Sequence, residues 1–324
     1  MFPRRQFINL AAGAAVFPFV NRMAVAQIYP SRSVRLILGA SPGGIIDILA
    51  RLMGQWLSER LGQSFVIDNR PGGGGAIAIE TVAKAAPDGY TLLMVGGMSA
   101  ANATLFDKLN VNFRRDIAPI AGISRETFAL LVSSSVPAGT VPDFISFAKA
   151  NPGKLNMASS GNGSASHLSG ELFKMMTGID MVHVPYRGGG PALTDIMAGQ
   201  VHVYFGPLPA AIEYIKAGKL RALGVTTMAR SHVLPDLPAL NEFVPGYEAS
   251  PVYGMGVPKE TPAEITEMLN HAINAALADA KMKARLADLG GTLLGGSPAD
   301  FGKLIGNETD KWAGVIKFSS IKAE

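Results

Sequence analysis

The sequence predicts an α/β protein of two lobes, each built on a parallel-type sheet flanked by helices. One local order, a strand followed by a glycine-rich loop and a helix, recurs along the chain and is typical of parallel, helix-covered sheets. The chain has 324 residues, of which 48% are hydrophobic and 17% charged. This is enough apolar material for about two domains. The repeats fall into two sets, and we expect the chain to cross between the lobes near residues 125–130 and near residue 250.

The first 26 residues predict an export signal. Arg4-Arg5-Gln6-Phe7-Ile8 begins a stretch at 7–20 that is apolar and rich in small residues, and Ala24-Val25-Ala26 matches a signal-peptidase site. The paired arginines resemble a twin-arginine signal, so the export route is either Sec or twin-arginine. The alternative is a membrane anchor, but the uncharged core is shorter than the ~20 residues that a spanning helix needs.

Little net charge is left once this signal is removed. The whole chain has a formal net charge of +4, and the signal holds Arg4, Arg5 and Arg22 without an acidic residue, so removing these three arginines leaves +1. Lys and Arg are scattered without a long run, so we expect no nucleic-acid partner. The chain has no cysteine, which excludes disulfides, cysteine metal sites and cysteine nucleophiles.

The segment at 34–61 is the clearest repeat and a candidate anion site. Residues 34–38 form an apolar run typical of a strand, and residues 41–44, Ser-Pro-Gly-Gly, form a turn. The helix that follows has apolar residues at helical spacing, namely Ile46, Leu49, Met53, Leu57 and Leu61. The first N–H groups of such a helix have no partner within it and lie at the positive end of its dipole, so the loop can hold a small anion.

The same order continues through the first lobe. It predicts a strand, a glycine loop, a strand and a small-residue loop at 64–68, 69–75, 91–95 and 96–99. Near the C-terminus, Thr261-Pro262-Ala263-Glu264 and Ser297-Pro298-Ala299-Asp300 each match the start of a helix with a capping box. These last helices have apolar faces but no glycine loops, so we expect them to cover the first lobe.

A second set of repeats begins near residue 128. It predicts strands at 128–132, 155–159, 181–184, 201–205 and 220–226. The loop Ser160-Gly161-Asn162-Gly163-Ser164 precedes a helix that begins near His167. We therefore expect a first domain of residues 27–125 and 252–324 and a second domain of residues 126–251. Ligands of open α/β sheets bind beyond the carboxyl ends of the strands, where these loops lie, so the cleft between the lobes is the expected site.

Motifs spread over the whole mature chain carry a family resemblance. They are Tyr29-Pro30-Ser31-Arg32-Ser33-Val34, Pro42-Gly43-Gly44 with Asp47, Asn69-Arg70-Pro71-Gly72, Ala85-Ala86-Pro87-Asp88-Gly89-Tyr90-Thr91-Leu92, Ser159-Ser160-Gly161-Asn162-Gly163 with His167-Leu168, His183-Val184-Pro185-Tyr186, Gly218-Lys219-Leu220-Arg221-Ala222-Leu223 and Leu234-Pro235-Asp236. With these motifs the sequence resembles the extracytoplasmic solute receptors of tripartite tricarboxylate transporters, the Bug-type binding proteins of bacterial periplasms.

The resemblance implies a fold and a function. The fold is that of a two-lobed periplasmic binding protein (a Venus flytrap) with two hinge crossings, and the protein is not an enzyme. Such a receptor closes on a small organic carboxylate and presents it to the permease subunits of a tripartite tricarboxylate transporter. We therefore expect a monomer in the periplasm that needs neither a cofactor nor a metal.

The resemblance places the ligand contacts in the loops around Gly43, Ser99 and Ser160, with Tyr186 and the loop at Gly206 closing the pocket. Two roles stay open, because Asp47 could cap its helix or contact the ligand, and His167 could donate to a carboxylate or tie its loop to its helix. The candidate ligand-binding residues are Ala40, Pro42, Gly43, Gly44, Asp47, Met98, Ser99, Ser160, Gly161, Gly163, Ser164, His167, Tyr186 and Gly206.

The sequence departs from the family pattern at two places. Ile45 and Ile46 stand where the family usually has a hydroxyl residue, and Gly206-Pro207 follows a strand where Asp or Asn is common. Losing a polar group on each wall predicts a less polar ligand, for instance an aromatic or short branched monocarboxylate.

Other features of the sequence point to functions other than a receptor. Gly73-x-Gly75-x-x-Ala78 matches a dinucleotide fingerprint, but no acidic residue follows about 20 positions later to bind a ribose, which favours a structural turn. An exported hydrolase would use Ser160 or Ser164, yet no Gly-x-Ser-x-Gly elbow is present. A ligand-binding input domain for a membrane sensor kinase is a third alternative. Zinc is disfavoured because no pair has zinc-ligand spacing among His183, His202, His232 and His271.

Overall fold

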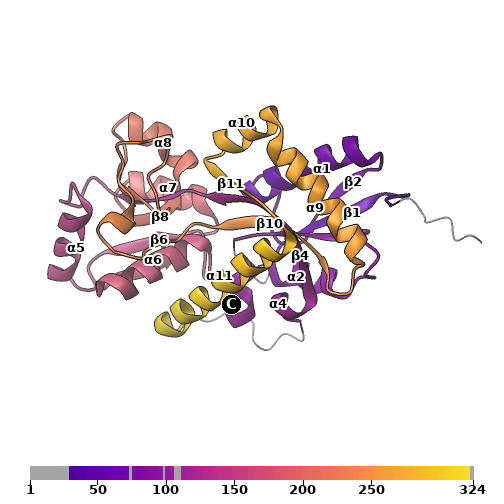
Figure 1. The fold of residues 1–324 in the computed structure, drawn as a ribbon. Helices are drawn as coiled ribbons and strands as arrows, with labels where there is room; N and C mark the ends of the chain where they lie inside the picture. Colours follow the sequence, from indigo (N-terminus) through magenta and orange to yellow (C-terminus); the bar gives the residue numbers. More distant parts are fainter. Residues whose placement is uncertain (1–28, 73–74, 98, 106–110, 322–324) are drawn as a thin grey trace, which may run out of the picture.

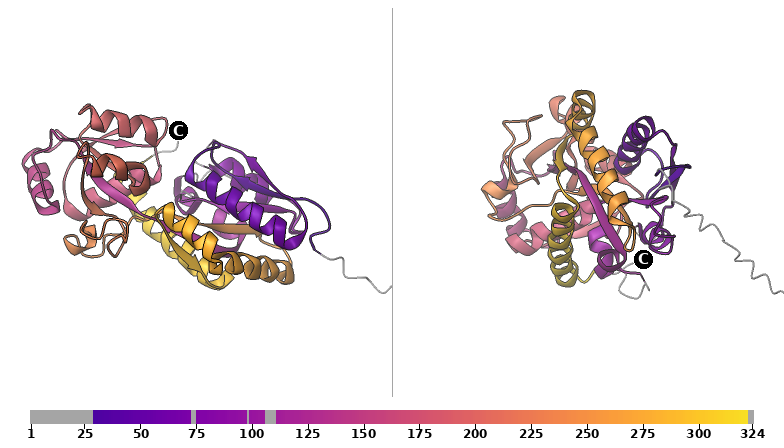
Figure 2. Two further views of the ribbon diagram at one scale, coloured as in Figure 1. Left: turned by 90° about the horizontal axis from the view of Figure 1, so that it is seen from above. Right: turned by 45° about the vertical axis from the view of Figure 1, so that its right-hand side comes forward.

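The computed structural model of the chain describes residues 29–72, 75–97, 99–105 and 111–321. These residues form two lobes, which lie side by side and are joined where the chain crosses between them (Figures 1 and 2). The predicted export signal at residues 1–26 and the candidate contact Met98 lie outside the described residues, as do Gly73 and Gly74 of the glycine loop.

The sheet of the first lobe has the strand order β11-β4-β10-β3-β1-β2 (Figure 1). Its strands are β1 Val34–Leu38, β2 Phe65–Asn69, β3 Thr91–Val95, β4 Ile117–Glu126, β10 Val252–Pro258 and β11 Gly291–Gly295. Strand β1 runs parallel to β2 and β3. Strand β10 runs antiparallel to β3 and β4, and β11 runs antiparallel to β4.

The sheet of the second lobe has the strand order β7-β6-β8-β5-β9. Its strands are β5 Phe128–Val132, β6 Asn156–Ser159, β7 Val182–Pro185, β8 Val203–Pro207 and β9 Arg221–Val225. Strand β6 runs parallel to β7 and β8, whereas β5 runs antiparallel to β8 and β9.

Both sheets are therefore mixed, although the repeats predicted parallel pairing. The prediction holds for β1, β2 and β3 and for β6, β7 and β8, which the repeats connect. Two of the antiparallel strands, β5 and β10, are the first strands of their lobe after the chain crosses from the other one. Only Thr127 separates β4 from β5. Both strands are thus placed by a crossing between the lobes and not by a strand–loop–helix repeat, whose crossover helix is what makes neighbouring strands parallel.

Helices cover both faces of each sheet. They are α1 Ile45–Leu61, α2 Ala76–Ala83, α3 Ser99–Leu105, α4 Phe113–Asp116, α5 Val141–Ala150, α6 Ala165–Thr177, α7 Gly189–Met197, α8 Leu208–Lys216, α9 Ala263–Ala278, α10 Ala280–Asp288 and α11 Pro298–Ser319, with a short 3₁₀ turn at Leu240–Glu242. In β1, Leu36 packs in a core with α1 and α9, while its neighbour Ile37 packs with α2 on the opposite face. This alternation is the period of two expected of a strand buried on both sides.

Two predicted helix starts have different outcomes. Ser297 is confirmed as a capping box, because its side chain accepts from Asp300 N–H and the Asp300 carboxylate accepts from Ser297 N–H. The capping box at Thr261 is wrong. Helix α9 begins at Ala263 with Pro262 as its N-cap, so Thr261 lies too early to cap it, and its buried hydroxyl has no hydrogen-bond partner among the described residues.

The strands β4 and β11 and the helix α10 were not predicted from the sequence. Pro119 and Gly122 interrupt the apolar run of β4, and β11 is a short glycine-bounded segment. Both features weaken a local strand signal. These strands pair with each other and β4 pairs with β10, so contacts distant in sequence stabilise them.

The two crossings are tied to each other and to helix α11. Glu126 N–H donates to Pro251 O at 2.9 Å, which joins the outgoing and the returning chain. Arg125 forms an ion pair with Glu248, and its guanidinium lies 3.6 Å from the Glu308 carboxylate of α11. These contacts make the crossing region a defined hinge candidate.

Helix α11 does not cover the first lobe alone, as its pattern led us to expect. Its first turns bury Phe301 and Ile305 in a core of the first lobe. Its later residues Trp312, Val315 and Ile316 pack in the core that α5 and α6 form on the second sheet. In the view of Figure 1, α11 runs from the region of β10 and β4 down to a position below α6.

Candidate ligand-binding site

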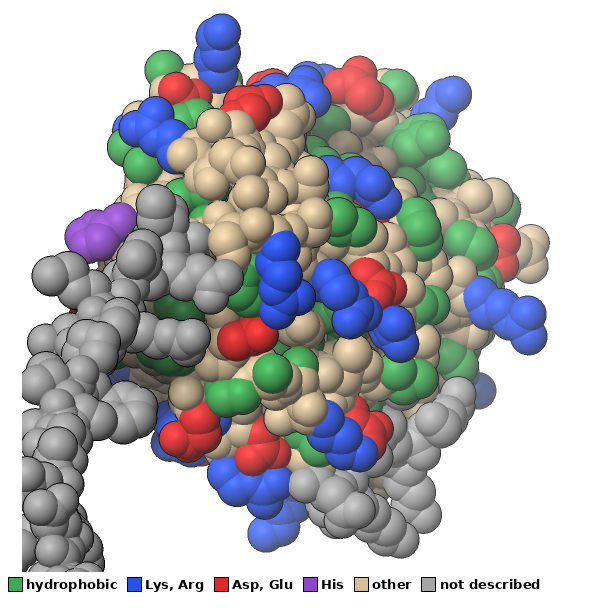
Figure 3. All heavy atoms as spheres, turned by 90° about the vertical axis from the view of Figure 1, so that its right-hand side faces the viewer, with side chains coloured by type: hydrophobic (Ala, Val, Ile, Leu, Met, Phe, Trp, Pro, Cys, Tyr) green, Lys and Arg blue, Asp and Glu red, His purple; other side chains and the backbone are tan. Residues whose placement is uncertain are grey.

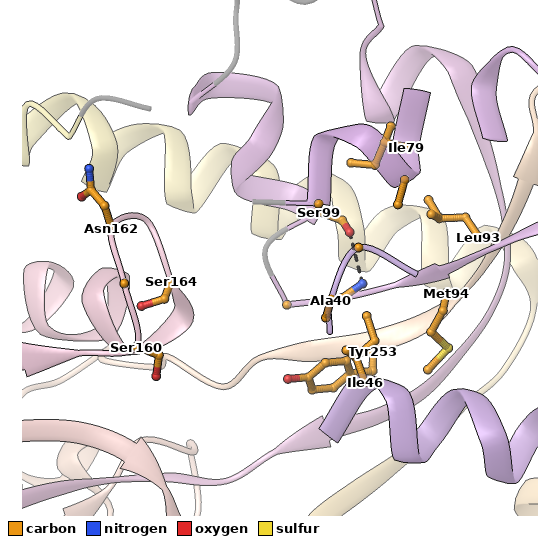
Figure 4. Close-up of a pocket in the computed structure, with 16 residues that line it drawn as sticks. Ala40, Ile46, Ile79, Leu93, Met94, Ser99, Ser160, Asn162, Ser164 and Tyr253 are labelled. Carbon is orange, nitrogen blue, oxygen red and sulfur yellow. Dashed lines mark hydrogen bonds between the residues drawn. The ribbon is translucent and has the colours of Figure 1, made fainter. Parts of the chain in front are cut away.

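A cavity of about 300 Å³ lies between the two lobes (Figure 4). The first lobe contributes Gly39, Ala40, Ile46, Gly75, Ala78, Ile79, Leu93, Met94, Gly96, Gly97, Ser99 and Tyr253. The second lobe contributes Ser160, Gly161, Asn162 and Ser164. None of the described residues that line the cavity carries a charge, so recognition has to use apolar surface, backbone groups and hydroxyls.

The first-lobe wall is largely apolar. Ile46 lies in the first turn of α1, Ile79 lies in α2, and Leu93 and Met94 come from β3. Figure 4 shows these side chains on one side of the cavity, with the Tyr253 hydroxyl directed toward the opposite lobe. The wall therefore suits the hydrocarbon part of a ligand.

Glycines bring the loops of this wall close together. A Cβ on Gly39 would lie 2.4 Å from Gly75 Cα, a distance that no side chain tolerates, and Gly75 has a left-handed φ of 93°. At the next loop, Gly96 N–H donates to Ser99 Oγ at 3.1 Å, the dashed line in Figure 4, and Ser99 N–H donates to Gly96 O at 2.9 Å. Backbone and a single hydroxyl thus form this part of the lining.

The second-lobe wall is a serine-rich segment, residues 160–164, which we call the serine loop. Ser160 Oγ lies 3.2 Å from Tyr204 Oη and accepts from Ser166 Oγ at 3.2 Å. Ser164 caps α6 by accepting from His167 N–H at 3.3 Å, and its Oγ lies 3.0 Å from Ser166 Oγ. The hydroxyls of Ser160 and Ser164 are therefore held in place by a hydrogen-bond network with Tyr204 and Ser166.

The sequence led us to expect free backbone N–H groups in these loops, and the structure corrects this at several positions. Ser160 N–H donates to Ser166 Oγ at 2.8 Å, Gly161 N–H to Ser159 Oγ at 3.2 Å, and Gly163 N–H to His167 Nδ1 at 3.0 Å. Because glycine-rich turns close on themselves and on nearby side chains, these donors have internal acceptors before any ligand arrives.

Some predicted site residues line the cavity and others do not. The cavity lining includes Ala40, Ser99, Ser160, Gly161 and Ser164. Outside it lie Pro42, Gly43, Gly44, Asp47, Gly163, His167, Tyr186 and Gly206. Pro42, Gly43 and Gly44 are exposed at the edge of the first lobe. Their role as ligand contacts stays a prediction.

The Asp47 carboxylate is bonded to its loop, to its own helix and to strand β2. Its carboxylate accepts from Gly43 N–H at 3.0 Å, from Arg51 at 2.9 and 3.0 Å, and from Asn69 Nδ2 at 3.0 Å. The Arg51 guanidinium, aided by these amide donors, lowers the pKa of the Asp47 carboxyl to about 2. Asn69 also donates to Ala40 O at 2.9 Å. Asp47 therefore holds the loop that carries Ala40 in place. Its bonds are to the protein itself, and a contact between Asp47 and the ligand stays a prediction.

Tyr186 and Gly206 lie behind the second-lobe wall. The Tyr186 hydroxyl donates to Asp195 Oδ2 at 2.7 Å, and burial together with this carboxylate raises the pKa of Tyr186 to about 12. Gly206 lies in β8, where a Cβ would meet the Tyr204 ring at 2.3 Å. The absent side chain at Gly206 thus makes room for Tyr204, whose hydroxyl lies beside Ser160.

Several cavity residues gave no signal in the sequence. Ile79, Leu93, Met94 and Tyr253 look like ordinary core positions of helices and strands, and only the packing of the lobes brings them to the cavity. Of the two isoleucines that depart from the family pattern, Ile46 lines the cavity, whereas Ile45 packs against the first-lobe core.

Features of metal sites and of membrane spans are not found in the described part of the chain. Within the described residues, no group of three or more His, Cys, Asp and Glu side chains could hold a metal ion. None of the helices in this part of the chain has the length and apolar character to span a membrane. On the face shown in Figure 3, basic and acidic side chains are interspersed, without the single-sign patch that a nucleic acid would need.

Comparison with known proteins agrees with this geometry. The family model described as "Tripartite tricarboxylate transporter family receptor" matches residues 49–321. Protein BugT of Bordetella pertussis is 33% identical over 300 residues, which cover 92% of this chain and 92% of BugT.

Solved structures show the same fold. The structure titled "R. palustris Rpa4515 with adipate" is 40% identical with a TM-score of 0.81, covering 91% of this chain and 99% of that one. MatC from Rhodopseudomonas palustris with bound malate is 31% identical with a TM-score of 0.78, covering 89% and 100%. The periplasmic binding protein BugD is 28% identical with a TM-score of 0.78, covering 91% and 100%.

Proposed function

Because this chain belongs to the tripartite tricarboxylate transporter receptor family, we propose that it captures a small organic carboxylate in the cavity between its lobes. Its relatives are solute-binding proteins, and the chain is a receptor and not an enzyme. The observation that carries the proposal is the cavity itself, which has an apolar wall on one lobe and a serine loop on the other. Ser160 was the candidate nucleophile of a hydrolase, and its hydroxyl is instead part of the Tyr204–Ser166 network.

The chemistry of the two walls assigns the parts of the ligand. The carboxylate would meet the hydroxyls of Ser160 and Ser164 and the backbone around Ala40 and Gly97, directly or through ordered water. The hydrocarbon would lie against Ile79 and the neighbouring apolar side chains. Two solved relatives are described with adipate and with bound malate, which supports a small carboxylate here. The apolar wall favours a ligand less polar than malate, such as an aliphatic, aromatic or branched acid.

Capture would work by closure of the lobes. We propose that residues 27–125 with 252–324 form one domain and residues 126–251 the other, with α11 packed on both. A ligand that touches both walls stabilises the closed form by contacts that the open form lacks. To change the ratio of closed to open molecules from 1:99 to 99:1, the ligand must bind the closed form about 5.5 kcal/mol more favourably than the open form. Several charge-assisted hydrogen bonds together with burial of the apolar part are sufficient.

The family also suggests where the receptor works and what it serves. Its solved members include periplasmic binding proteins. We propose that this chain is exported by the Sec or twin-arginine route, acts in the periplasm as a monomer, and delivers its ligand to the permease subunits of a tripartite tricarboxylate-type transporter. Mass measurement of the mature chain, expected to begin at Gln27, tests the export step.

A thermal-shift screen followed by calorimetry tests the function. The panel contains adipate, malate, citrate, benzoate and a branched monocarboxylate, each with the purified chain. A ligand at 100 times its dissociation constant stabilises the folded state by about 2.7 kcal/mol, which gives a clear rise in the midpoint. If no carboxylate stabilises the protein, the proposal is contradicted. If citrate binds tightly while benzoate and adipate do not bind, the preference for less polar ligands is contradicted.

A further inference from the structure

Two histidines lie stacked beneath the serine loop. The rings of His167, in the first turn of α6, and His183, in β7, have centroids 3.5 Å apart and planes 8° apart. His167 is 4% exposed, and His183 is partly buried. Neither ring lines the cavity.

Each histidine is bonded to the backbone of the loop, one directly and one through a serine. Gly163 N–H donates to His167 Nδ1 at 3.0 Å. His183 Nε2 lies 2.7 Å from Ser159 Oγ, and the same Ser159 Oγ accepts from Gly161 N–H at 3.2 Å and donates to Gly161 O at 3.0 Å. The pair thus holds the two glycines that separate Ser160, Asn162 and Ser164.

The bond to Gly163 fixes the tautomer of His167. A backbone N–H can only donate, so Nδ1 must carry a lone pair and the ring proton must lie on Nε2, which faces Glu171 Oε1 at 3.8 Å. Lys174, the other charged group that acts on both rings, forms an ion pair with Glu171 at 2.9 Å. Burial first, then the neighbouring His183 and Lys174, lowers the pKa of His167 to about 3. Burial, with Lys174, lowers the pKa of His183 to about 4.

We propose that His167 and His183 are positioning residues, a neutral stacked pair that holds Gly163 and Gly161 so that the serine loop faces the cavity in its binding shape before the ligand arrives. Glycine offers little resistance to other backbone conformations, and Gly161 and Gly163 have left-handed φ values of 127° and 67°. Without the two rings the loop would populate other shapes. The affinity for the ligand would then fall in proportion to the fraction of molecules whose loop still has the binding shape. The inference rests on the proposed function, because it takes the serine loop to be a ligand contact.

The first test needs no ligand. In the purified chain, ¹⁵N imidazole spectra at neutral pH are expected to show His167 protonated at Nε2 only. The Gly163 amide is expected to resist hydrogen exchange, and this protection should fall about tenfold or more in His167→Leu, which fills the space without an acceptor. His167→Asn is the matched variant, because its amide oxygen takes the place of Nδ1 and can accept from Gly163.

The second test uses adipate as the probe. Calorimetry is expected to show adipate affinity reduced about tenfold in His167→Leu and in His167→Gln. The glutamine carbonyl lies one carbon too far from the backbone to accept from Gly163. His167→Asn should recover most of the lost affinity. His183→Phe keeps the stacking but removes the partner that holds the Ser159 hydroxyl, so exchange of the Gly161 amide should rise and adipate binding should weaken.

The outcomes separate the two proposals. A His167 ring protonated at Nδ1, or Gly163 exchange equal in wild type and His167→Leu, overturns the positioning role whatever the protein binds. Affinity for adipate equal in wild type, His167→Leu and His167→Asn also overturns it. If His167→Leu does not fold, the spectra of the wild type and the comparison of His167→Asn with His167→Gln still decide. If the wild type binds no carboxylate but its Gly163 amide loses protection in His167→Leu, the proposed function is contradicted. The contact between His167 and the loop is then still supported.

Discussion

Gly39 and Gly75 lie in backbone contact across the first-lobe wall of the cavity, since a Cβ on Gly39 would stand 2.4 Å from Gly75 Cα. Gly39 follows β1 and Gly75 precedes α2, so this contact sets the distance between two loops that both line the cavity. The depth of the apolar wall beneath them, at Ile79 and Met94, depends on that distance.

Gly39→Ala is expected to separate these loops. Its Cβ would collide with backbone that cannot rotate away, so we expect a loss of about 1–3 kcal/mol in unfolding free energy and binding of adipate too weak to measure. Denaturant titration and calorimetry give the two values. Gly139→Ala is the matched control, because nothing lies within 4 Å of a Cβ there. Equal affinity in the two variants would show that the spacing of the loops does not matter for binding.

Ile46→Thr is expected to shift specificity toward hydroxylated acids. Ile46 lines the cavity from the first turn of α1, so the new hydroxyl would become part of the lining. We expect the ratio of malate to adipate affinity to rise about tenfold, through one added hydrogen bond and lost apolar contact. Ile48→Thr, on the same helix but 37% exposed and outside the lining, should leave the ratio unchanged. Calorimetry with both acids decides, and parallel shifts in the two variants would speak against the assignment.

Glu126→Gln is expected to flatten the pH dependence of stability. Burial raises the pKa of the Glu126 carboxyl from its usual 4.5 to about 7, so between these values the folded chain holds a proton that the unfolded chain has released. The stabilisation is complete below pH 4.5 and is lost as pH rises through 7. The variant should therefore match wild type near pH 4.5 and exceed it in unfolding free energy by about 3 kcal/mol near pH 8.

Denaturant midpoints of both proteins across this range test the prediction. Glu213→Gln serves as the control, because its side chain is 80% exposed. A Glu126→Gln chain that is less stable than wild type at pH 8 would mean that the buried carboxylate is ionised and compensated in the fold.

Trp312→Ala is expected to weaken the second lobe although the residue lies in the last helix. Trp312 is 5% exposed and packs in the core of α5 and α6, and its Nε1–H donates to Glu308 Oε2 at 2.9 Å. We expect the free energy of unfolding to fall by about 3–5 kcal/mol, and amide hydrogen exchange to increase most in α6. Phe318→Ala, on the same helix but 55% exposed, should change stability by about 0.5 kcal/mol or less. Exchange that rises in the first lobe alone would contradict the packing of α11 on both lobes.

The repeated order of strand, loop and helix was readable in the sequence because it is local. Apolar runs of the right length, the glycines of the loops and the cap at Ser297 act within a few residues of one another, so β1, α1 and their successors were predicted close to their observed bounds. The motifs that carry the family resemblance are local as well, which is why the fold and the receptor function followed from them. Ala40, Ser99, Ser160, Gly161 and Ser164 were found by the same means, since they lie in those loops.

Contacts distant in sequence decided the rest. Strand β4 exists because β10 returns from the second lobe and β11 pairs with its other edge, and no short-range pattern encodes that meeting. The apolar wall at Ile79 and Met94 could not be predicted from the sequence, because residues of a core and residues that line an apolar cavity have the same apolar character. The sequence by itself thus determined the fold class, the loops and the kind of protein. Only the tertiary structure decided which hydrogen-bond donors the protein already uses, which apolar side chains the cleft exposes, and that His167 meets His183, because burial and pairing are properties of the assembled chain.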